Sequence, residues 1–188
     1  MTRRKVWIAL LVCGLATFAA VGLLEYRWRQ SLLPLGVRAP VITYAKETTW
    51  GWGPGGNETG VIVYRMDRTS AERVRAGGIA WLEGEASRPT GPLQRPAADR
   101  RLRRTYSDWR TTPLEALWSG HGEHSCGREP GLGAYVDYDD FRCRVDPEVI
   151  ARANRVLQTP GAFVARGQAG RIVIVAPAER LVIIAYNG

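Results

Sequence analysis

The sequence predicts an α+β protein: an N-terminal single transmembrane helix followed by one domain with a mainly antiparallel sheet. Three observations carry this prediction. An uncharged apolar stretch lies near the N-terminus, three short β-branched segments joined by tight turns end the chain, and two segments carry helix-start signals, near Ser70 and Pro147. Short connections between strands force antiparallel pairing. From the helix-start signals we expect two or three helices to cover the sheet.

The apolar stretch Val6–Leu24 contains no charged side chain and directly follows three basic residues. A helix of that length rises close to the roughly 30 Å thickness of a bilayer core. A cleaved signal peptide is the alternative, but its apolar core usually has only about 7 to 15 residues. Trp7 at one end and Tyr26 and Trp28 at the other would form aromatic belts at the two membrane interfaces. We therefore expect an uncleaved span.

The predicted span divides the chain into four parts. Residues 1–5 form a basic tail that is expected to stay cytoplasmic, 6–24 the transmembrane helix, 25–40 a juxtamembrane linker with prolines and a glycine, and 41–188 one exported domain. The expected location is the inner (cytoplasmic) membrane, single-pass, with the C-terminal domain on the periplasmic or extracellular side.

The net charge of +8 comes almost entirely from arginine. The chain has no RNP, helix-turn-helix or zinc-finger pattern, so nucleic acid is not an expected partner. An exported basic surface instead suits anionic lipid headgroups, an anionic wall polymer or an envelope protein.

Local signals place the elements of the domain. Val41–Tyr44 is compatible with a short strand, and Val61–Met66 is β-branched and bounded by turn residues. A capping-box spacing from Thr69 to Glu72 predicts a helix that Gly77-Gly78 ends. Asp146-Pro147-Glu148 opens a second helix, which ends at Thr159-Pro160-Gly161. The predicted C-terminal strands are Phe163–Ala165, Arg171–Val175 and Leu181–Tyr186. The last two are apolar at every position, which predicts burial on both faces.

The glycine-rich stretch from Trp50 to Gly60 reads as a loop, because glycine and proline prevent regular structure. It lacks the Gly-Lys-Ser/Thr ending of a phosphate-binding loop. One interpretation is a turn system that pins Trp50 and Trp52 over the core. The other keeps both indoles exposed as stacking faces or headgroup anchors.

Between Ser87 and Arg110 arginines greatly outnumber carboxylates. This basic patch is either a solvated excursion or a contact surface for an anionic partner, with Trp109 interleaved for stacking. The candidate contact arginines are Arg100, Arg101, Arg103 and Arg104.

Three chemistries compete at His121, His124, Cys126 and Cys143. Cys126 and Cys143 are the only cysteines of the exported part, which predicts a disulfide. The same four residues could instead hold zinc, although their spacing matches no standard site. Third, Cys143 lies between Arg142 and Arg144, a setting that lowers a thiol pKa and suits a nucleophile with a histidine as its base. The disulfide is the favoured interpretation, and no cofactor is expected. The alternative is a bound zinc ion.

The sequence thus favours a non-catalytic binding or accessory module of the cell envelope, because it has few general bases and no recognised catalytic motif. One alternative is a small metal- or thiol-dependent hydrolase that uses His121, Glu123, His124 and Cys143. The other is a subunit of a membrane assembly whose anchor helix contacts a partner.

Overall fold

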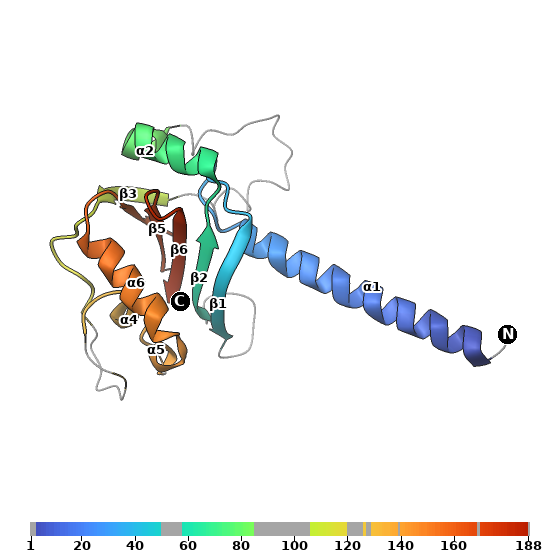
Figure 1. Ribbon diagram of the computed structural model, residues 1–188. Coiled ribbons are helices and arrows are strands. Elements are labelled where there is room, and N and C mark those ends of the chain that lie inside the picture. The colour runs from blue at the N-terminus through green and yellow to red at the C-terminus, as the bar shows by residue number, and fades with distance from the viewer. Residues whose placement is uncertain are drawn as a thin grey trace. The chain divides into compact units, whose positions relative to one another are not determined.

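The computed structural model of the chain falls into two units, Met1–Leu32 and Leu33–Gly188. It describes residues 3–49, 58–84, 106–119, 126, 129–138, 140–168 and 170–187. Figure 1 shows the long N-terminal helix and the sheet with its helices. The fold is α+β, as predicted.

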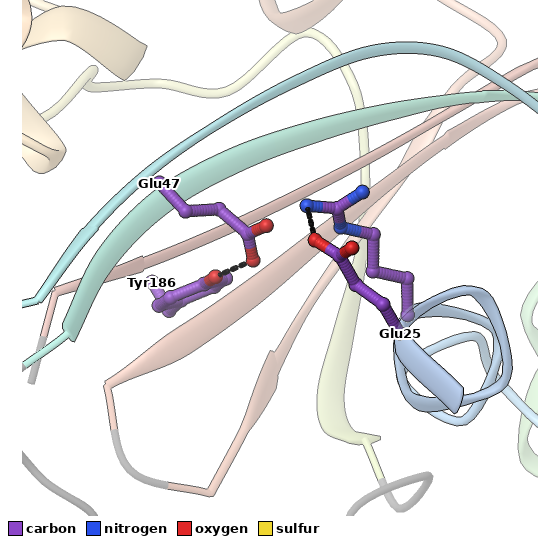
Figure 2. Close-up of polar contacts among 4 residues, drawn as sticks. Glu25, Glu47 and Tyr186 are labelled. Atoms are coloured by element: carbon purple, nitrogen blue, oxygen red, sulfur yellow. Dashed lines mark hydrogen bonds and ion pairs between the residues drawn. The ribbon is translucent and has the colours of Figure 1, made fainter. Parts of the chain in front are cut away.

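The first unit is the helix α1 (Arg3–Gln30), which continues past the predicted end at Leu24. No helix breaker lies between Leu24 and Gln30, and Arg29 pairs with Glu25 four residues earlier at 2.7 Å, which supports the last turn (Figure 2). Within Leu10–Gln30 a stretch of 18 residues has a mean hydropathy of 1.5, and none of that stretch is buried. The length and composition of α1 therefore fit a membrane span or a signal sequence.

Part of the stretch expected to be a linker packs into the second unit. Leu33, Val37 and Ala39 are buried. The Arg38 N–H donates to Ser70 Oγ at 2.9 Å, and the Asp67 N–H donates to the Arg38 carbonyl at 2.9 Å. Apolar residues just before Pro34 and between Pro34 and Pro40 thus contribute to the core of the domain.

The second unit is built on one antiparallel sheet. Its strands are β1 (Val41–Thr49), β2 (Glu58–Arg65), β3 (Tyr106–Thr111), β4 (Phe163–Gly167), β5 (Arg171–Ala176) and β6 (Leu181–Asn187), in the order β1-β2-β6-β5-β4-β3. The Val61 strand (β2) and the three C-terminal strands lie in one antiparallel sheet, as expected, with β2 pairing with β6; β1 and β3 extend the sheet at its two edges.

Four helices accompany the sheet in the described part of this unit: α2 (Arg68–Glu83), α4 (Leu132–Tyr135), α5 (Phe141–Arg144) and α6 (Pro147–Gln158). One core cluster joins one set of alternating strand residues, such as Val63 and Ile183, to Leu157 of α6 and Phe141 of α5. The opposite set, which includes Val173, is also buried. The central strands are therefore buried on both faces, as their apolar sequence predicts.

The helix starts show how local signals and tertiary contacts combine. Asp146 caps α6 as predicted, with its side chain accepting from the Glu148 N–H. The cap of α2 is Asp67, which lies before the expected Thr69, because Ser70 uses its hydroxyl for Arg38 and its N–H for the Asp67 carboxylate. At the predicted stop, Gly77-Gly78, the helix is interrupted: Gly78 has a non-helical φ of 54° and ψ of −142°, and a second helical segment continues to Glu83 across this kink.

Candidate binding groove

Most of the residues predicted to carry function lie outside the described residues. They are Trp50, Trp52, Arg100, Arg101, Arg103, Arg104, His121, Glu123 and His124. The structure describes Trp109, Cys126 and Cys143.

The predicted disulfide is present. Cys126 and Cys143 are bonded, with their Cα atoms 5.4 Å apart, and both residues are exposed. A bonded sulfur is neither a thiolate ligand nor a nucleophile, so the zinc and thiol alternatives require the reduced protein. Among the described residues, no group of three or more His, Cys, Asp or Glu side chains is placed to hold a metal ion.

A groove of about 730 Å³ lies beside the edge strand β3. Its volume falls within the range of about 300 to 1,000 Å³ that is usual for ligand sites. It is lined by residues of β3 and β4, by the segment that follows β3, and by Ile79 and Ile172.

The apolar part of the groove is fixed to the core. Val164 and Ile172 belong to the buried cluster, and Leu114, Leu117 and Trp118 are half-buried against it. The ring of Trp118 lies 5.0 Å from that of Tyr135, at 56°.

Hydrogen bonds hold the segment after β3 in place. The Thr112 hydroxyl donates to the Thr159 carbonyl at 2.5 Å and accepts from the Ala162 N–H at 3.0 Å. The Leu114 N–H donates to the Leu157 carbonyl at 3.0 Å. The apolar wall is therefore tied to the end of α6 and the start of β4.

A β-bulge interrupts the pairing of β3 with β4 at this groove. Ser107 pairs with Arg166 and Arg110 with Val164, so Asp108 and Trp109 together oppose a single residue of β4. Asp108 has a φ of 56°, in the left-handed region that side chains rarely adopt. Bulges of this kind are frequent next to functional sites.

Trp109 itself lines the groove but is only 7% exposed, which does not suit the predicted role of an exposed stacking face. Its ring lies 6.3 Å from that of Tyr106. The indole is buried beside Tyr106, which explains why Trp109 is not exposed as predicted. The indole Nε1 is buried and has no hydrogen-bond partner among the described residues, which is an uncommon condition for a buried donor.

Arg110 and Arg166 line the groove and are exposed. The β3–β4 register places both on the face of the sheet that carries Val164. Neither forms an ion pair with a carboxylate in the described part of the chain. Burial raises the pKa of Tyr135, and the positive charge of Arg166 partly opposes that shift. Asp108 and Glu115 also line the groove.

Arg166 was not among the site residues predicted from the sequence. The period of two along Phe163–Gly167 was the available signal, because it places Arg166 on the same face as Val164. The presence of a groove there depends on the segment after β3, whose position the sequence pattern does not reveal.

A second polar contact lies at the opposite edge of the sheet. Tyr186 donates a hydrogen bond to the Glu47 carboxylate (Figure 2). Gly60 of β2 pairs with both residues and so lies between them. Burial, the hydrogen bond and the negative charge of Glu47 raise the pKa of Tyr186 above its ordinary value. A Cβ on Gly60 would clash with the Tyr186 ring. We interpret this contact as structural, because it joins three strands.

Comparisons with known proteins add no relative. No family model matches the chain, and neither a curated protein nor a solved structure matches it.

Proposed function

We propose that this chain is a membrane-anchored, exported, non-catalytic binding or accessory module of the cell envelope, whose domain contacts a protein partner or an anionic surface. α1 would be the anchor, and 41–188 would lie on the periplasmic or extracellular side. The groove beside β3 would be one contact site and the basic patch a second.

The disulfide is the observation that carries the proposed location. Cys126 and Cys143 are exposed, so a reducing cytosol would have access to the bond. Disulfides persist in oxidising compartments and are rare in the cytosol. The exposed apolar helix α1 would hold the domain there.

The groove supports a binding role. It combines a buried apolar floor with two exposed arginines that have no described ion-pair partner. Ligand sites are typically apolar clefts with a few polar groups that fix orientation. The formal charge of +8 favours a contact with an anionic surface elsewhere on the domain.

Membrane fractionation and protease treatment of intact spheroplasts test the location. We expect the full chain to remain in the membrane after alkaline carbonate washing, and added protease to remove the domain while cytosolic markers survive. Release of the chain by carbonate, or protection of the domain until the cells are lysed, would contradict the proposal.

Binding of labelled polyphosphate by the full chain in neutral-lipid nanodiscs tests the anionic contact. We expect Gln substitutions at Arg100, Arg101, Arg103 and Arg104 to abolish binding that weakens as salt increases. The matched control replaces four other exposed arginines, Arg65, Arg68, Arg73 and Arg155, with Gln. Equal losses in the two quadruple variants would show a nonspecific effect of net charge and remove the basic patch from the proposal.

A further inference from the structure

The groove beside β3 has the chemistry of a site for one localised negative charge. Arg110 and Arg166 both line it, and the guanidinium fork binds a carboxylate with two parallel hydrogen bonds. Asp108 and Glu115 line the same groove and would repel further negative charge. This arrangement favours a single carboxylate over a polyanion.

The apolar part of the groove lies next to those arginines. Arg110 pairs with Val164 in the β3–β4 register, and Arg166 pairs with Ile172 in the β4–β5 register. Leu117 and Trp118 form the half-buried wall. A ligand that fits therefore carries an apolar group close to its carboxylate, as the last residue of a polypeptide does.

The bulge adds polar groups that a peptide can use. Asp108 and Trp109 stand opposite one residue of β4, and a bulged residue leaves the ladder of an edge strand locally unpaired. Peptide carbonyl and amide groups can bond with these groups, whereas an acyl chain cannot. Edge strands commonly accept extended peptides.

We propose that this groove binds the carboxyl-terminal end of a partner polypeptide, with Arg110 and Arg166 holding the terminal carboxylate and Leu117 and Trp118 contacting an apolar last side chain. This inference rests on the proposed binding role and names its partner class. Asp108 and Glu115 would disfavour acidic residues just before the terminus.

The test uses the full chain in neutral-lipid nanodiscs and two pools of labelled hexapeptides. Both pools have five randomised positions and a final leucine. One pool ends in a free carboxylate and the other in a carboxamide. We expect the chain to enrich the free-acid pool, and the enriched peptides to bind at least tenfold more weakly when they are resynthesised as amides.

Three variants locate the binding. Arg110→Gln and Arg166→Gln should each weaken binding of the enriched peptides about tenfold, whereas Arg155→Gln, an exposed arginine on α6 that does not line the groove, should leave it unchanged. Near-ultraviolet circular dichroism checks that each variant is folded.

Equal enrichment of the two pools, or equal effects of Arg166→Gln and Arg155→Gln, would overturn the inference. So would binding of dodecanoate at this groove with no enriched peptide, because the ligand would then be an amphiphile. None of these results alters the protease test of location, so failure of this inference and failure of the proposed function can be told apart.

Discussion

Near each edge of the sheet a glycine faces a tyrosine, but the two pairs have different roles. In each case the strand next to the edge has a glycine that faces a tyrosine: Gly60 of β2 opposite Tyr186 of β6, and Gly167 of β4 opposite Tyr106 of β3. A tyrosine that covers a glycine in the neighbouring strand compensates for the missing side chain.

The direction in which the tyrosine reaches differs between the edges. Tyr186 comes from an inner strand and crosses β2 to bond Glu47 on the edge strand β1. Tyr106 belongs to the edge strand itself and contacts Trp109. The pairing of β1 with β2 shifts register between Ile42 and Tyr44 but is regular around Glu47, whereas the bulge of β3 lies beside the groove. At the β1 edge the contact between Tyr186 and Glu47 joins the edge strand to β6, whereas the β3 edge borders the groove for which we propose a binding role.

Replacing the two glycines should have unequal effects on stability. Gly60→Ala should lower the free energy of unfolding by about 3 kcal/mol, because the new Cβ would displace a buried ring and break its hydrogen bond. At Gly167 the nearest atom to an added Cβ is Tyr106 Cε1 at 2.9 Å, on an edge strand of the described sheet, so Gly167→Ala should cost about 1 kcal/mol. Chemical denaturation of the full chain in mild detergent measures both. Equal losses would contradict the contrast between the edges.

Removing only the hydroxyl at the β1 edge should cost less. Tyr186→Phe should lower the free energy of unfolding by about 1 to 2 kcal/mol, because the buried hydrogen bond to Glu47 is lost. Glu47→Gln keeps an acceptor oxygen and serves as the matched variant, with an expected loss below about 1 kcal/mol. If Glu47→Gln is less stable than Tyr186→Phe, the hydrogen bond between Tyr186 and Glu47 does not stabilise this edge in the way described.

The raised pKa of Tyr186 predicts a pH dependence in the alkaline range. Above about pH 10 tyrosine ionises in the unfolded chain while Tyr186 in the folded chain keeps its proton, so stability falls as pH rises. The stability advantage of the wild type over Tyr186→Phe should therefore shrink by about 1 kcal/mol between pH 9 and pH 11. Denaturation curves at both pH values measure the change. A constant advantage would show that the hydroxyl ionises equally in both states.

The smallest expected effect is at the bulge of β3. Asp108→Gly should raise the free energy of unfolding by up to about 0.5 kcal/mol, because glycine adopts a φ of 56° without strain. Ser107→Gly, one residue earlier and outside the left-handed region, should instead lower it by about 0.5 to 1 kcal/mol. Thermal unfolding of both variants tests the opposite signs, and a loss in both would mean that the bulge is not strained at Asp108.

Strong local signals allowed much of the fold to be predicted. Asp146 and Pro147 fix the start of α6, and the tight turns after β4 and β5 force antiparallel pairing. The disulfide followed from the presence of only two cysteines in the domain. The helix start and the turns depend on residues close in sequence, and two cysteines in the domain allow one intramolecular pairing.

The edges were harder to predict because edge strands are partly polar and are stabilised by tertiary pairing. β1 continues beyond Tyr44 through Lys46 and Glu47, which lack an apolar alternation. β3 lies directly after the arginine-rich stretch, and its bulge breaks the period of two. The groove therefore could not be seen in the sequence, although Arg110 was already part of the predicted basic patch.

Membrane topology is the most direct test of the proposed account. Two reporters fused separately after Gly188, an alkaline phosphatase that is active only outside the cytosol and a fluorescent protein that folds only inside it, would report the side on which the domain lies. We predict phosphatase activity without fluorescence. Fluorescence without phosphatase activity would place the domain in the cytosol and contradict the proposed anchor orientation and location together.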